Sequence, residues 1–420
     1  MKTITGGVTA PKGFTASGVH CGVKQGKGDG NQPPMSGKPE VLEGKKDLAL
    51  ILSERECTAA GMYTLNRVKA APIYVTMDHL ENGVAQGIVA NSGNANACCP
   101  MSHENAETMC ELAAQATGLK ASDFVVASTG VIGQTLNIAA IAQGLPAAAK
   151  ALSKDGSDAA AHAIMTTDTV KKELAVTCTV GGKTVTIGAI AKGSGMIHPN
   201  MGTMLCFVTT DCAITHELLS DAMHEIIPRT FNRVTVDGDT STNDTCVVLA
   251  NGMAENPLIE WKDESYTVFY KALYYVFEQL ARGIAADGEG ASKLITCTVR
   301  GSRSEEAAER LSKSVVGSPL VKAAMFGSDA NWGRVLCAMG YSKAPFRPEY
   351  VDVTFRSDVG EIAVCRQGQA VDFDEDLATS ILSQDEVVID IDVNEGEHQA
   401  TCWGCDLTYD YVKINGDYRT

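Results

Sequence analysis

Long apolar segments are missing from this chain of 420 residues. No stretch of about 18 uncharged apolar residues occurs, which a helix needs to cross a bilayer, so we expect no transmembrane helix. Residues 1–12 contain no apolar run that would suit the core of a signal peptide. Basic residues are scarce, with 35 Lys and Arg against 51 Asp and Glu and a formal net charge of -16. This balance argues against binding to nucleic acids or anionic membranes, because their phosphates are bound by clustered Lys and Arg.

Disulfide and metal frameworks also have little support. The 14 Cys are scattered along the chain and fall well below the density of disulfide scaffolds, so we expect reduced thiols in a cytoplasmic protein. Cys402 and Cys405 form one Cys-x-x-Cys motif. A structural zinc site needs further ligands at matching spacing, and neither the other Cys nor the eight His supply them. We therefore expect no metal, and the role of this Cys pair stays open.

Several common motifs for nucleotide binding and hydrolysis are absent. Gly182-Lys183-Thr184 resembles the end of a P-loop, but Thr177 occupies the position where that loop needs its first glycine. No Gly-x-Ser-x-Gly nucleophile elbow and no His-Glu-x-x-His metalloprotease motif occurs. The sequence therefore excludes the most easily recognised ATPases, serine hydrolases and zinc proteases.

The hydrophobic pattern indicates helices mixed with strands. Two runs rich in β-branched residues, 176–180 and 184–191, flank Gly181-Gly182 and predict a β-hairpin. Helices are predicted over 138–150, 157–165, 217–227 and 270–286. Strands are predicted at 48–53, 87–91, 124–128, 204–208, 387–393 and 399–408, the last two as a closing pair. The Gly-, Pro- and Ser-rich segment 26–46 predicts an exposed loop.

The most unusual stretch is 192–203, where Gly, Pro and Asn gather directly before the apolar run 204–208. A threonine becomes a nucleophile when its own free α-amine, with a pKa of about 7.7–8, acts as the base. That chemistry at Thr203 requires a cut in the chain before it, and Gly202 leaves this peptide bond open to attack. On these residues alone, a structural threonine at the start of a strand is the simpler interpretation. His198 lies in the same stretch, and a local structural role is the simpler interpretation for it too.

Longer motifs favour a catalytic role for Thr203 over a structural one. They are GGVTAPKGF at 6–14, NSGNANAC at 91–98, ASTGVIG at 127–133, MTTDT at 165–169, KGSGMIHPNMGTMLCFVTTD at 192–211, FNRVTVDGDTSTNDT at 231–245, GSDANWGR at 327–334 and INGDYRT at 414–420. In content and order, over nearly the whole chain, they resemble the ornithine acetyltransferase family, the glutamate N-acetyltransferases of arginine biosynthesis. One departure is Gly202, where the family usually has Ala.

The resemblance implies a self-cleaving acetyltransferase. Thr203, freed by cleavage of the Gly202–Thr203 bond, would take acetyl from N2-acetylornithine and pass it to glutamate in a ping-pong reaction. Thr129 and Gly130 match the family's oxyanion pair. The substrate-binding positions of the family fall on Thr166, Lys192, Thr203, Glu289, Asn415 and Thr420, with Thr167 as an alternative to Thr166. Lys192 would hold a carboxylate of the substrate, and Glu289 would hold the distal ammonium of the substrate.

The fold implied by the resemblance is of the α/β (α+β) class, a layered αββα sandwich with self-processing like that of N-terminal-nucleophile enzymes. Cleavage would give an alpha chain of residues 1–202 and a beta chain of residues 203–420. Two copies of each would form a cytoplasmic heterotetramer that acts on small molecules without a cofactor. Use of acetyl-CoA as a second acetyl donor stays open. The alternatives are a related amidohydrolase or aminopeptidase, in which water takes the acyl group, and an uncut binding protein without catalysis.

Self-cleavage is directly measurable. We predict two chains, 1–202 and 203–420, for the wild-type protein and a single uncut chain for Thr203→Ala, because the substitution removes the attacking hydroxyl. Intact-mass spectrometry of both purified proteins measures this. An active wild-type protein that consists only of the uncut chain would contradict the prediction.

Overall fold

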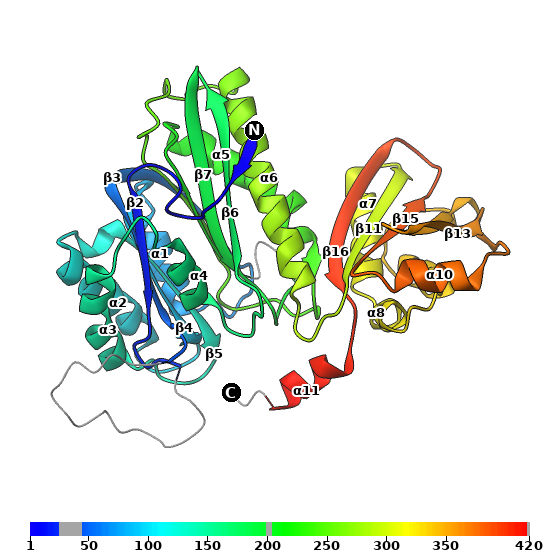
Figure 1. The fold of residues 1–420 in the computed structure, drawn as a ribbon, viewed down its shortest axis with the longest axis horizontal. Coiled ribbons are helices and arrows are strands. Elements are labelled where there is room, and N and C mark those ends of the chain that lie inside the picture. Colours follow the sequence, from blue (N-terminus) through cyan, green and yellow to red (C-terminus); the bar gives the residue numbers. More distant parts are fainter. Residues whose placement is uncertain (25–43, 199–203, 418–420) are drawn as a thin grey trace.

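The computed structural model describes residues 1–24, 44–198 and 204–417, which form two β-sheets with helices packed against them (Figure 1). The predicted loop over 26–46 falls almost entirely outside these residues. Within the described ranges, no helix is both long enough and apolar enough to cross a membrane. The mixed α/β class agrees with the sequence-based expectation.

The first sheet has nine strands in the order β1-β6-β7-β8-β10-β3-β4-β5, with β2 paired to β3. Their bounds are β1 Lys2–Ile4, β2 Phe14–Val19, β3 Leu48–Tyr63, β4 Val84–Asn94, β5 Phe124–Val131, β6 Lys172–Val180, β7 Lys183–Lys192, β8 Leu205–Thr210 and β10 Thr245–Ala250. The beginning of β3 pairs with β2 and its end with β10. Its register with β4 shifts between Leu52 and Cys57. The long β3 strand therefore joins two parts of the sheet.

These two parts enclose a shared core, which includes Ile51 and Ile88 from one part and Phe207 and Leu249 from the other. The helix α4 (Ser157–Ile164) contributes to the same core. On the opposite face of β3–β5 lie α1 (Ala71–His79), α2 (Ser102–Thr117) and α3 (Ile138–Lys150). The opposite face of β6, β7, β8 and β10 is covered by α5 (His216–Ile226) and α6 (Glu264–Ala286). Helices thus cover both outer faces of a doubled sheet (Figure 1).

The second sheet has seven strands in the order β14-β13-β12-β15-β11-β16-β9. Their bounds are β9 Val234–Thr235, β11 Leu294–Ser302, β12 Asp352–Ser357, β13 Gly360–Arg366, β14 Gln369–Ala370, β15 Glu386–Asp392 and β16 His398–Cys405. Its core is completed by α7 (Glu305–Val316), α8 (Pro319–Phe326), α9 (Trp332–Gly340) and α10 (Glu375–Leu382). The last helix, α11 (Tyr409–Asp417), leaves this sheet and extends toward the first one (Figure 1).

Most local predictions agree with the structure. The predicted hairpin is β6–β7, and Gly181 and Gly182 adopt the positive φ angles of +54° and +79° that its turn requires. The helix predicted over 138–150 is α3, and the predicted strand 204–208 corresponds to β8. The α6 helix begins earlier than predicted, because the Asp263 side chain accepts a hydrogen bond from the Tyr266 amide at 3.0 Å and caps it.

Two strand predictions were wrong. The strands β15 and β16 do not form a closing pair, because both are bonded to β11, which lies between them. The β3 strand continues to Tyr63, ten residues beyond the predicted end, through the exposed polar segment 54–56.

Cys402 and Cys405 are buried on β16, and no group of His, Cys, Asp or Glu among the described residues is arranged to hold a metal ion.

The β8 strand lies directly after the predicted cut and in the interior of the first sheet. It is antiparallel to β7 and parallel to β10, and all of its residues are buried. Segments before and after the predicted cut therefore contribute neighbouring strands to one sheet.

Removal of the Phe207 ring tests the importance of this strand. Phe207 is fully buried, and a Phe→Ala change at such a site costs about 3–5 kcal/mol of stability. We expect Phe207→Ala to lower the midpoint of thermal unfolding markedly in scanning calorimetry. Trp261, which is 76% exposed, provides the control, and Trp261→Ala should leave the midpoint nearly unchanged. Equal midpoints for the two variants would contradict the packing described here.

Candidate active site

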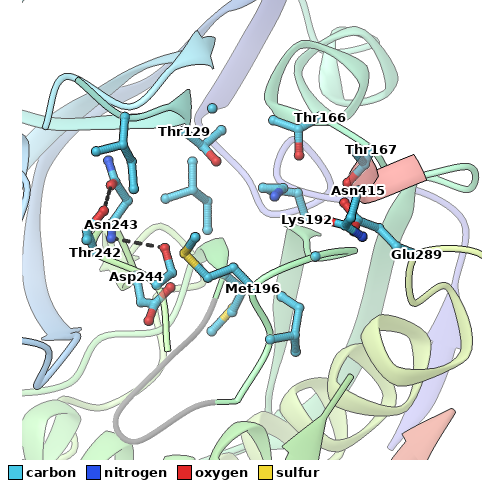
Figure 2. A pocket seen from close by; sticks show the side chains of 17 residues that line it. Thr129, Thr166, Thr167, Lys192, Met196, Thr242, Asn243, Asp244, Glu289 and Asn415 are labelled. Carbon is cyan, nitrogen blue, oxygen red and sulfur yellow. Dashed lines mark hydrogen bonds between the residues drawn. The ribbon is translucent and has the colours of Figure 1, made fainter. Parts of the chain in front are cut away.

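A cavity of about 510 Å³ opens at the end of the first sheet where β5 and β7 finish and β8 begins (Figure 2). The described site candidates from the sequence all line it, namely Thr129, Gly130, Thr166, Thr167, Lys192, Glu289 and Asn415. Both Thr166 and Thr167 reach the cavity, so the choice between them stays open. Gly202, Thr203 and Thr420 lie outside the described residues, but Met204, which follows Thr203 in the chain, also lines the cavity.

The wall that carries Thr129 and Gly130 depends on a close approach between β5 and β4. Gly130 has a φ of +132°, and a Cβ atom there would lie 2.3 Å from the carbonyl carbon of Gly93. Only glycine tolerates this conformation and this contact. The buried Asn243 side chain stabilises the end of β5, because its Nδ2 donates hydrogen bonds to the carbonyl oxygens of Ser128 at 2.8 Å and Ala95 at 2.6 Å.

Lys192, at the end of β7, is buried. Burial lowers the pKa of Lys192 below its usual value, and the charge of Asp168 opposes this fall most strongly. Burial alone would raise the pKa of Asp168, but Lys192 and Lys172 outweigh it and hold that pKa below its ordinary value. The Asp168 carboxylate also accepts hydrogen bonds from the amides of Thr166 at 3.1 Å and Gly193 at 2.8 Å. Asp168 lies within the MTTDT motif, but no role for it could be inferred from the sequence.

The opposite wall carries Glu289, which follows α6 and is 8% exposed. Its Oε2 accepts a hydrogen bond of 2.7 Å from Nδ2 of Asn415 on α11 (Figure 2). Gly195 makes room for this pair, because a Cβ atom there would lie 2.4 Å from the Glu289 carboxyl carbon. Thr408, just before α11, donates to the carbonyl oxygen of Gly290 at 2.6 Å. The C-terminal helix thus reaches the cavity, as the position of Asn415 in the family motif implied.

A further carboxyl group, that of Asp244, lines the cavity beside Met204. It is 1% exposed, and among the described residues its Oδ2 has no hydrogen-bond partner. Burial raises the pKa of Asp244 well above its ordinary value, although hydrogen bonding by Thr64, Ser241 and the Met204 amide opposes the rise. Asp244 was not among the expected site residues, and its place in the FNRVTVDGDTSTNDT motif is the only signal for it in the sequence.

The segment before the predicted cut is held by the loop after β9. Asp237 accepts hydrogen bonds from the amides of Met196 at 2.7 Å and Ile197 at 2.9 Å. His198 Nδ1 lies 3.0 Å from Thr235 Oγ1. Burial, with a smaller effect from Lys313, lowers the pKa of His198 to about 4, so its ring is neutral at pH 7. This position supports a local structural role for His198.

Taken together, the cavity offers a strand-end hydroxyl and amide for an oxyanion, a buried ammonium for a carboxylate, and a carboxylate–amide pair for an ammonium. An amino acid is a zwitterion, and opposite charges on two walls would orient it. The arrangement suits acyl transfer to or from an amino acid.

Comparisons with known proteins agree with this chemistry. The model of the ArgJ family matches residues 36–420. The chain is 51% identical to the arginine biosynthesis bifunctional protein ArgJ of Symbiobacterium thermophilum, over the full length of both chains. It is 44% identical to the protein of that name from Bacillus subtilis, over 99% of this chain and 97% of that protein.

Two solved structures are also similar in sequence. A crystal structure of ArgJ from Bacillus halodurans is 46% identical, covers 50% of this chain and 98% of its own, and has a TM-score of 0.48. An ornithine acetyltransferase from Mycobacterium tuberculosis, solved in complex with ornithine, is 35% identical over 46% of this chain and 95% of its own, with a TM-score of 0.39.

A side chain at position 195 tests the Glu289 wall. In Gly195→Ala the new methyl group would displace the Glu289 carboxylate and break its bond to Asn415. We expect the Kd for an amino acid with a distal ammonium, measured by titration calorimetry with ornithine as the probe, to rise about tenfold, equivalent to about 1.4 kcal/mol. Gly340→Ala is the control, since a Cβ atom there would meet nothing within 4 Å. Equal affinities in the two variants would contradict this assignment of the wall.

Proposed function

The chain belongs to the ArgJ family, and we propose that it transfers the acetyl group of N2-acetylornithine to glutamate in arginine biosynthesis. The products are ornithine and N-acetylglutamate. One observation carries the proposal: residues that the family resemblance assigned to catalysis and binding come from distant parts of the sequence and line a single cavity.

Acetyl transfer would proceed through an acetyl-threonine. The freed α-amine of Thr203 takes the proton from its own hydroxyl, and the hydroxyl oxygen attacks the acetyl carbon of N2-acetylornithine. The Thr129 hydroxyl and the Gly130 amide donate to the resulting oxyanion. Collapse of this intermediate breaks the C–N bond, and the proton leaves with the ornithine amine. The neutral amine of glutamate then attacks the ester, loses a proton, and restores the threonine hydroxyl.

Binding of N2-acetylornithine would use both charged walls of the cavity, whereas glutamate would share only the Lys192 wall. The Lys192 ammonium holds the α-carboxylate, and the Glu289–Asn415 pair holds the distal ammonium of ornithine. Thr166 or Thr167 and the C-terminal Thr420 complete the substrate contacts. The burial of Lys192 and Glu289 supports this arrangement, because charge–charge attraction is stronger where water is excluded.

We infer that the catalytic amine arises by self-cleavage at Gly202–Thr203. The threonine hydroxyl attacks the preceding carbonyl, an ester forms by an N-to-O shift, and water hydrolyses the ester. The products are the alpha chain 1–202 and the beta chain 203–420, within a fold of the N-terminal-nucleophile type. Two copies of each would assemble in the cytoplasm as a heterotetramer, without nucleic acid, membrane or cofactor.

A second activity is proposed for the same site. The relatives' names describe bifunctional proteins, and acetyl-CoA would supply acetyl to the same threonine before glutamate removes it. This reaction makes N-acetylglutamate without N2-acetylornithine, and it needs no further nucleophile.

Product analysis tests the proposal. Wild-type protein with N2-acetylornithine and glutamate should release ornithine and N-acetylglutamate in equal amounts, and acetyl-CoA should replace the first substrate. Thr203→Ala should lose about 10⁴-fold or more of the rate, because it lacks the nucleophile. The exposed Thr184 supplies the control, and Thr184→Ala should retain full activity. Free acetate in place of N-acetylglutamate would instead identify an amidohydrolase.

A further inference from the structure

One buried lysine outside the cavity lining is connected through hydrogen bonds to three segments that line the cavity. Lys172 is the first residue of β6, and its side chain is 4% exposed. Its Nζ donates to Asp168 Oδ1 at 2.6 Å and also to Asp287 Oδ2. Two carboxylates from different parts of the chain therefore share one buried ammonium.

The Asp168 end of this bridge reaches two walls. Besides Lys172, the carboxylate of Asp168 accepts from the amide of Gly193, the residue directly after Lys192, and from the amide of Thr166. Its side chain is fully buried. The backbone positions of Thr166 and Lys192 thus depend on the placement of one carboxylate.

The Asp287 end reaches the third wall. Asp287 follows α6, two residues before Glu289, and its side chain is 10% exposed. It accepts from the Thr169 amide, the Thr169 hydroxyl and the Val170 amide. These bonds tie the segment that follows Thr166 to the start of the Glu289 wall.

The negative charges of Asp168 and Asp287 explain why a cation is needed between them. The titratable groups that influence Lys192 are Asp168, Lys172, Glu289, Asp244 and Lys24. Without Lys172, two largely buried carboxylates would lose their shared partner, and an unpaired buried charge is costly. Asp168 would then draw the Lys192 ammonium toward itself and compete with a substrate carboxylate for it.

We propose that Lys172 is a positioning residue for acetyl transfer, acting through Asp168 and Asp287. It fixes Thr166, Lys192 and Glu289 relative to one another and leaves the Lys192 ammonium available to the substrate. This role rests on the proposed function, because it presumes that the cavity binds the amino-acid substrates.

The neighbouring lysine offers a matched control. Lys171 also bridges two carboxylates, with Nζ 2.5 Å from Asp158 Oδ1 and 2.7 Å from Glu173 Oε2, but its side chain is 36% exposed, whereas that of Lys172 is 4% exposed. Lys172→Met should raise the KM for N2-acetylornithine about tenfold or more, because the unpaired Asp168 carboxylate would compete with the substrate for Lys192. Lys172→Arg should recover most of this loss, and Lys171→Met should leave KM and kcat unchanged.

Asp168→Asn keeps the side chain's shape and provides a second variant that does not depend on the folding of Lys172→Met. It removes the charge that most supports the protonated form of Lys192. The pKa of Lys192 should fall further, so the alkaline limb of the kcat/KM profile should move to lower pH, and KM should rise. A purely structural role would lower the unfolding temperature and leave KM and the pH profile unchanged.

The outcomes separate the two proposals. Normal acetyl transfer by the wild type, with unchanged KM in both Lys172→Met and Asp168→Asn, would overturn only the role of Lys172. A wild-type protein without acetyl transfer would overturn the proposed function, and this role with it. A rise in KM in both variants, with Lys171→Met unaffected, would support the role.

Discussion

The hydrogen-bonded ladder between β7 and β8 sets the position of the site. Lys192, the last residue of β7, is the register partner of Leu205, the first residue of β8. Where one antiparallel strand ends, its neighbour begins, so Lys192 and Leu205 lie at the same end of the sheet. The end of β5, with Thr129 and Gly130, lines the same cavity. The ladder therefore places the start of β8 opposite the strand end that can donate to an oxyanion.

Buried charges are the second constraint, because each one costs solvation free energy unless it has a partner. Around Lys192 the cost is offset by Asp168, which is itself paired with Lys172. Asp244 lacks such a partner for its Oδ2 among the described residues, and its pKa rises accordingly. The carboxyl groups of Asp168, outside the cavity lining, and of Asp244, within it, therefore differ in proton affinity, and their surroundings rather than their residue type create this difference.

The sequence was sufficient to predict the features that depend on residues close together in the chain. Gly181-Gly182 between β-branched runs was sufficient for the β6–β7 hairpin, and the family resemblance named seven of the described residues that line the cavity. The insertion of β11 between β15 and β16 was not predictable, since it pairs segments separated by about ninety residues. The bond between Lys172 and Asp287, which are 115 residues apart, was missed for the same reason. Each residue resembles an ordinary surface charge until the fold brings them together.

The walls of the cavity come from both sides of the predicted cut. Thr129 and Lys192 precede it, whereas Asp244 and Glu289 follow it. A cut before Thr203 breaks one covalent bond but none of the ladders that join β8 to β7 and β10. All the β8 residues are buried, so withdrawal of this strand would expose the core on both faces of the sheet. Cleavage can therefore create a free amine at the site while hydrogen bonding and packing keep the two halves of the cavity together.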